Sequence, residues 1–172
     1  MRVARRLFPV VLGTLLLAGM GRAPTGNPMP SACDVLRALP ADDLAGQSLE
    51  YRTTQDRADA DMRMSMCTAL GGDDMPAVTL LLRQDLSAAG PQPASEARER
   101  MIAELTGSLG HAPAVGFAEI GEAAMWVEEI GQLTVWYRAG RVMLIVTAGG
   151  IGPKADEDLA KQVARGIVAR FP

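Results

Sequence analysis

The sequence predicts an α+β fold, in which a single mostly antiparallel sheet with a C-terminal meander is packed by two longer helices and a short N-terminal helix and tied by one disulfide. Three observations predict it. Short apolar runs are separated by turn signals, two other segments repeat apolar residues at helical spacing, and short connections make neighbouring strands antiparallel. The 172-residue chain is 48% hydrophobic and 22% charged, which excludes a disordered polymer.

The first 23 residues are expected to be a secretory signal peptide. Arg2, Arg5 and Arg6 precede an apolar run over residues 7–17, and small residues then end at Ala23. The run is shorter than the roughly 20 residues that a membrane-spanning helix needs. We therefore expect a periplasmic or secreted protein that does not span a membrane, the alternative being an uncleaved anchor.

Cleavage after residue 23 would change the charge of the chain. It would remove four arginines and no acid, so the formal charge would fall from −3 to −7. Nucleic-acid binders carry a basic face, so no nucleic acid is expected as a partner. Residues 24–30 contain three prolines and are expected to form a flexible lead-in to a single domain over residues 31–172.

Two cysteines, Cys33 and Cys67, are present in the chain. An oxidising compartment favours a disulfide between them, which would contribute about 3–4 kcal/mol. The alternatives are free buried thiols or metal ligands.

The expected elements follow in order along the chain. Ser31 and Asp34 form a capping pattern that opens a short helix, which Pro40 ends. Strands are then expected over residues 49–54, 62–69 and 78–83.

The second half of the domain begins with a helix capped by Ser95. Its apolar residues recur every four positions, at Ala97, Met101, Leu105 and Leu109. Four strands of a meander are expected over residues 115–119, 123–128, 133–138 and 141–147. A last helix carries its core residues at Leu159, Val163, Ile167 and Phe171.

The meander is apolar on both sides, so each face of its sheet needs a cover. Amphipathic helices cover one face. The second face is expected to carry Trp126, Trp136, Met143 and Ile145, and its cover is a helix of the same chain, a second subunit or a ligand. For binding at this face, Trp126 and Trp136 are the expected rigid anchors, with Met125, Met143 and Ile145 as the other candidate residues.

Three methionines alternate along one expected strand. Met62, Met64 and Met66 share one face, and thioether sulfur suits Cu(I) in an exported protein. Cys67 points to the opposite face, and methionine is a common apolar filler, so packing is favoured over copper.

No enzyme signature is found, and neither an enzymatic activity nor a cofactor is expected. His111, the single histidine, lies in a loop context. The sequence has no Walker-type loop, GxGxxG loop or GxSxG elbow. Four acids flank the meander and are expected to be solvated turn charges rather than ligands of a cation or a basic partner: Glu119, Glu122, Glu128 and Glu129.

Several short motifs carry a family resemblance. They are the opening Ala32-Cys33-Asp34-Val35-Leu36, the second cysteine after two strands, and the hairpin motifs over residues 121–126 and 140–146. With these motifs the chain resembles small exported bacterial lipoproteins and extracellular kinase-sensor domains, found especially in actinobacteria. The resemblance implies a disulfide-tied α+β domain that binds something outside the cytoplasm. Met20 stands where the lipoprotein signal would have its lipidated cysteine, so no lipid anchor is expected.

The function expected from these observations is that of an exported, non-enzymatic binding or sensor domain. It would recognise an apolar ligand or a protein partner, a second copy of the chain included, through the second face of its sheet. One alternative is an acidic inhibitor or immunity-type protein that binds a basic partner. The other is a periplasmic copper-binding protein.

Overall fold

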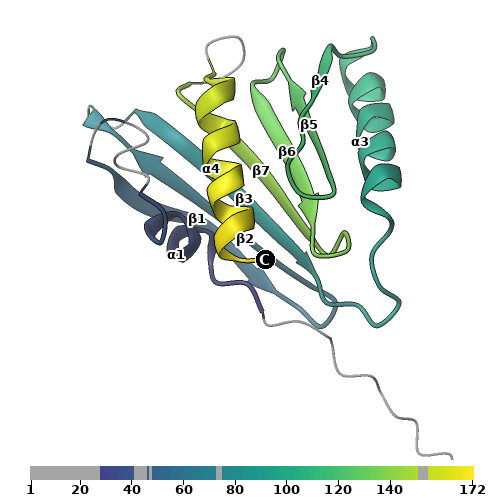
Figure 1. Ribbon diagram of the computed structural model, residues 1–172, viewed down its shortest axis with the longest axis horizontal. Coiled ribbons are helices and arrows are strands. Elements are labelled where there is room, and N and C mark those ends of the chain that lie inside the picture. The colour runs from purple at the N-terminus through teal and green to yellow at the C-terminus, as the bar shows by residue number, and fades with distance from the viewer. Residues whose placement is uncertain (1–27, 41–45, 47, 73–74, 151–154) are drawn as a thin grey trace, which may run out of the picture.

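The computed structural model describes residues 28–40, 46, 48–72, 75–150 and 155–172, so the expected signal peptide lies outside the described residues. It confirms the α+β class. One open sheet of seven antiparallel strands has the order β1-β2-β3-β7-β6-β5-β4, and helices pack on it (Figure 1). None of the helices in these residues is long and apolar enough to cross a membrane.

The sheet consists of two meanders joined where β3 pairs with β7. The strands are β1 Glu50–Ala58, β2 Met62–Leu70, β3 Pro76–Asp85, β4 Val115–Phe117, β5 Ala123–Val127, β6 Gln132–Tyr137 and β7 Val142–Ala148. β1 extends beyond the expected strand over residues 49–54, because Asp56 and Arg57 continue the pairing opposite Ser65 and Met64.

In the described residues three helices pack on the sheet, α1 Ala32–Arg37, α3 Ala94–Leu109 and α4 Glu157–Arg170. The Ser31 side chain accepts a hydrogen bond from the Asp34 amide at the start of α1, as the capping pattern predicts. Asp156 caps α4 in the same way, through the Leu159 amide. α1 and α4 cover one face of the sheet, whereas α3 lies on the other face beside β4 and β5 (Figure 1).

The helices therefore divide the apolar interior into two cores. The larger core joins α1 and α4 to β2, β3, β5, β6 and β7, and its centre includes Leu80, Leu133, Leu144 and Ile167. The smaller core lies under α3, where Met125, Val127 and Trp136 meet Met101 and Leu105.

Cys33 and Cys67 form a disulfide with an S–S distance of 2.04 Å, as predicted. The bond fixes α1 to β2, and both cysteines are buried in the larger core. A disulfide is compatible with an oxidising extracellular compartment.

The segment just before α1 is part of the folded domain. Met29 is fully buried, its amide donates to Gln84 Oε1 at 2.9 Å, and its carbonyl accepts from Arg63 at 2.8 Å. The Tyr137 hydroxyl donates to Met29 Sδ at 3.6 Å, and burial raises the pKa of Tyr137 to about 12. The expectation of a flexible lead-in is therefore wrong for Met29, while residues 24–27 lie outside the described part of the chain.

Candidate functional site

The side of the sheet that faces α3 is called the open face here. Cross-strand partners lie on the same side of a sheet, and one row across this face consists of Met64, Arg83, Met143 and Trp136. The next row consists of Met66, Leu81, Ile145 and Thr134.

α3 covers only one half of the open face. It packs chiefly on β5 and extends to Trp136 and Met143. Over β2 and β3 the apolar side chains of this face, such as Met64 and Leu81, are half-buried and belong to neither core. A helix therefore covers the β4–β6 half of the second face. No described helix covers the other half, which is formed by β2, β3 and β7. This second region is called the exposed half.

The two tryptophans lie on opposite faces, so the expectation that they share one is wrong. Trp126 pairs with Leu133 and is 6% exposed in the larger core, whereas Trp136 pairs with Ala123 and is 3% exposed in the smaller one. The β5–β6 connection causes this difference, because its length pairs even-numbered residues of one strand with odd-numbered residues of the other.

The other three candidate residues do lie on the open face. Met125 is fully buried under α3, so it belongs to the smaller core. Met143 and Ile145 are half-buried on β7, at the border of the exposed half that α3 approaches. Of the five candidates, Trp136 and Met143 line a pocket.

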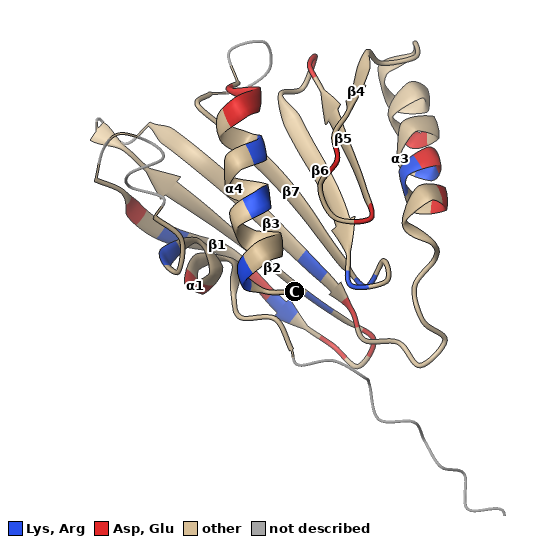
Figure 2. Cartoon of the chain, in the orientation of Figure 1, with Lys and Arg blue, Asp and Glu red and all other residues tan. Residues whose placement is uncertain are grey.

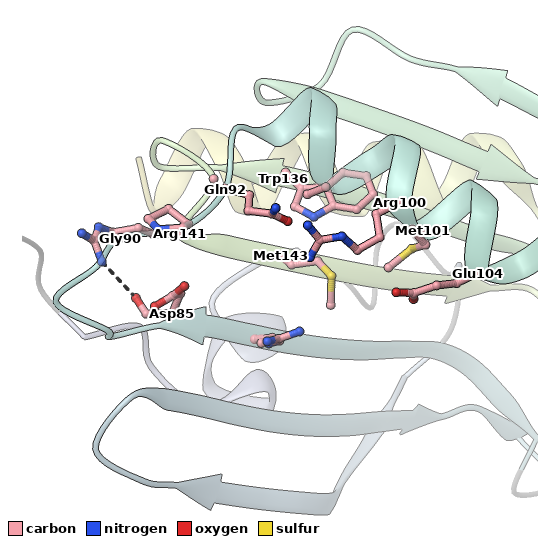
Figure 3. A pocket seen from close by; sticks show the side chains of 13 residues that line it. Asp85, Gly90, Gln92, Arg100, Met101, Glu104, Trp136, Arg141 and Met143 are labelled. Carbon is pink, nitrogen blue, oxygen red and sulfur yellow. Dashed lines mark hydrogen bonds between the residues drawn. The ribbon is translucent and has the colours of Figure 1, made fainter.

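The pocket has a volume of about 330 Å³ and lies between α3, the loop that precedes it, and the open face (Figure 3). Its apolar lining includes Met101 from α3, Trp136 from β6 and Met143 from β7. Its charged lining consists of Arg83, Asp85, Arg100, Glu104 and Arg141. Three positive charges therefore face two negative ones.

Two of these charged groups are engaged with the loop before α3. Arg141 Nη1 donates to the carbonyl of Ser87 at 3.3 Å and to that of Asp85 at 3.5 Å. Asp85 Oδ1 accepts from the Ser87 amide at 2.7 Å. Arg141 thus holds the loop against the β6–β7 turn and shapes this end of the pocket.

Arg83 and Arg100 have no such engagement. Both line the pocket, Arg83 from β3 of the sheet and Arg100 from α3, where Figure 3 labels it. Within the described part of the chain, neither side chain forms an ion pair or hydrogen bond. Two unpaired guanidinium groups therefore line one pocket.

The β6–β7 turn fixes the far wall of the pocket. Gly140 has φ +76°, and a Cβ there would lie 2.5 Å from the Gln92 carbonyl oxygen. Arg138 and Ala139 also have positive φ, and the Glu122 carboxylate accepts a hydrogen bond from the Ala139 amide. Because positive φ costs non-glycine residues about 1 kcal/mol or more, this bond offsets strain at the turn.

The methionines of β2 share one face, as expected, and their pairing with Asp85, Arg83 and Leu81 shows that this is the open face. Cys67 is committed to the disulfide and cannot be a ligand. No group of three or more His, Cys, Asp or Glu in the described ranges could hold a metal. A copper site would thus depend on thioethers from positions roughly 7 Å apart along a strand.

His111 and the acids near the meander lie at the surface. His111 Nε2 is 3.4 Å from Glu129 Oε1, and both side chains are exposed. Glu119, Glu122 and Glu128 are exposed as well.

The pocket arginines were not predictable from the sequence. The only signal was the position of Arg83, which follows Thr79 and Leu81 on the same face of an otherwise apolar strand. Arg100 gave no signal because a charged residue on a surface helix is ordinary. The sequence matches no protein-family model and no curated protein.

Proposed function

We propose that this chain is an exported, non-enzymatic binding or sensor domain that recognises a small ligand with an apolar body. The ligand binds at the exposed half of the open face and in the adjoining pocket. One observation carries the proposal: Met64, Met66, Leu81 and Ile145 form a half-buried apolar surface that no described helix covers and that continues into the pocket through Met143.

The shape of the site favours a small molecule over a protein partner. Small-molecule pockets range over about 300–1,000 Å³, and the volume of about 330 Å³ lies at the lower end of that range. Its lining combines apolar side chains such as Met101, Trp136 and Met143 with five charged ones, so it suits a ligand that has both an apolar and a polar part. The Cys33–Cys67 disulfide supports a place outside the cytoplasm.

Trp136 is the natural reporter for a binding test, because it lines the pocket and the chain has only two tryptophans. In the Trp126→Phe variant its fluorescence is read alone during titration with decyl maltoside below the micelle concentration. We expect a saturable change in the emission of Trp136.

A matched pair of variants tests the place of binding. Leu81→Gln alters the exposed half, whereas Ala169→Gln alters the exposed side of α4. Leu81→Gln should weaken binding about tenfold, since it removes most of a buried apolar contact, and Ala169→Gln should leave binding unchanged. Equal affinity of both variants, or a dimer in sedimentation that buries this face, would overturn the proposal.

A further inference from the structure

We infer that the ligand of this face carries an anionic group, a carboxylate, phosphate or sulfate, which binds between Arg83 of β3 and Arg100 of α3. The inference rests on the proposed function and specifies the class of ligand as a small anionic amphiphile. Its starting point is that two arginines without a partner in the described chain line the same pocket, one from the sheet and one from α3.

Arg83 and Arg100 are exposed like charges that line one pocket. An anion placed between them would gain charge-assisted hydrogen bonds from both sides. A guanidinium group presents a planar fork of donors that matches two oxygens of a carboxylate, phosphate or sulfate. A pair of such forks therefore selects an oxyanion over a neutral polar group.

The remaining charges of the pocket do not neutralise this pair. Arg141 is tied to loop carbonyls, and one oxygen of Asp85 is occupied by the Ser87 amide. Glu104 lies one helical turn after Arg100 and is the acid best placed to compete for it. With all five groups charged, the pocket carries a net charge of +1.

This positive charge stands out because the chain as a whole is acidic, with a formal charge of −3. Figure 2 shows basic segments of β3 and of the β6–β7 turn, with acidic segments beside them, at one end of the sheet, the end at which the pocket residues Arg83, Asp85 and Arg141 lie. A basic pocket in an acidic protein attracts an anion locally and repels it elsewhere. Charge complementarity thus favours an anionic over a cationic ligand.

The apolar part of the ligand has a continuous path out of the pocket. Arg83 is flanked in register by Met64 and Met143, and the next row is Met66, Leu81 and Ile145. A headgroup held by Arg83 would place an attached alkyl or aromatic body directly on these side chains. Methionine and branched aliphatic side chains adapt to such a body without demanding one shape.

An anion bound in this way would also link two parts of the fold. α3 packs chiefly on β5, while Arg83 belongs to β3 on the other side of β7 and β6. A headgroup shared by Arg83 and Arg100 would hold α3 to the exposed half. Binding would therefore stabilise the position of α3, which is a means by which a sensor domain could report its ligand.

The test uses four probes with the same ten-carbon chain in the Trp126→Phe background: decyl phosphate, decanoate, decyl maltoside and decyltrimethylammonium. Inorganic phosphate is added as a headgroup without a chain. We expect decyl phosphate or decanoate to bind about tenfold or more tightly than decyl maltoside, and inorganic phosphate to bind weakly. The first two probes also distinguish a phosphate ester from a carboxylate as the preferred headgroup.

Variants that each remove one positive charge test where the headgroup binds. Arg83→Met and Arg100→Met should each weaken the preferred anion about tenfold to hundredfold and leave decyl maltoside unchanged, and Arg83→Lys should recover part of the loss. Arg165→Met removes the same charge from the exposed surface of α4 and should have no effect. Unchanged binding of decyl maltoside shows that each variant is folded.

The outcomes separate this inference from the proposed function. Equal affinity for the anionic and neutral probes would overturn the anion site and leave the apolar face intact. Binding of decyl phosphate that resists both arginine substitutions would also overturn it. Failure of all four ten-carbon probes to affect Trp136 would overturn the proposed function itself.

Discussion

Leu80 and Leu81 are neighbours on β3, yet they lie in different environments. Leu80 points toward the face that α1 and α4 cover and is fully buried, whereas Leu81 points toward the open face and is only half-buried. Both faces of the sheet are apolar in composition. The difference arises because α1 and α4 together cover their face, while α3 covers only the β4–β6 half of the other. Apolar composition alone therefore does not distinguish core from binding surface.

Truncation of each leucine should give the largest contrast between the two faces. Leu80→Ala should lower the free energy of unfolding by about 2–5 kcal/mol because it leaves a cavity in the larger core. Leu81→Ala should cost about 1 kcal/mol, since its site is partly solvated. Urea denaturation of the two variants measures the difference, and equal losses would show that the open face is packed like a core.

Removal of the disulfide should affect stability without affecting the pocket. The double variant Cys33→Ala, Cys67→Ala opens a loop with a sequence separation of 34 residues, which should cost about 3–4 kcal/mol. The bond lies in the larger core, on the side of the sheet opposite the pocket. Ligand affinity measured through Trp136 at low temperature should thus remain within about twofold, and a larger loss would mean that the two faces are coupled.

Two glycine substitutions should distinguish the role of the β6–β7 turn, which forms a wall of the pocket, from that of α3. Gly140→Ala forces a Cβ against the Gln92 carbonyl at positive φ, so it should cost about 1–3 kcal/mol and weaken ligand binding. Gly107→Ala lies in α3, where an added Cβ meets nothing within 4 Å, and should stabilise the protein by about 0.5–1 kcal/mol. Thermal unfolding and titration of both variants provide the test; a stable Gly140→Ala variant with normal affinity would contradict this role of the turn.

The smallest expected effect is the alkaline response of the larger core. The pKa of Tyr137 is raised to about 12 by burial, so the folded state holds this proton more tightly than the unfolded state does. Its contribution to stability is complete below about pH 10 and is lost as the pH rises from 10 to 12. Between pH 8 and pH 11, the wild-type protein should therefore lose more unfolding free energy than Tyr137→Phe. Equal losses in the two proteins would show that Tyr137 ionises normally.

The fold was predictable because its signals are local. The capping pattern at Ser31, the apolar spacing of the two longer helices and the turns of the meander each act over a few residues. The disulfide was predictable from the number of cysteines and the expected export. In contrast, the burial of Met29 depends on Gln84 and Tyr137, more than 50 residues away, and no local pattern reveals it.

The candidate site was predictable only in part. Alternation within one strand places Met143 and Ile145 together, but the relation between strands depends on the connection that joins them. The predicted face of the Trp126 side chain was wrong for this reason. Arg83 and Arg100 line the same pocket only because of where α3 packs on the sheet. No pattern within either segment predicts this tertiary packing.

Accessibility of the methionines tests the central claim most directly, because the chain has methionines in each environment. Met62, Met64 and Met66 lie on the open face, Met29 and Met125 are fully buried, and Met75 is 66% exposed. The native protein is exposed briefly to hydrogen peroxide, and the oxidation of each methionine is followed by mass spectrometry.

The account predicts that Met64 and Met66 are oxidised at a rate between those of Met75 and Met29, and that decyl phosphate protects them while Met75 is unaffected. Oxidation of Met64 and Met66 as slow as that of Met29 and Met125, or the absence of any protection by the ligand, would contradict the claim that the exposed half of this sheet is a binding surface.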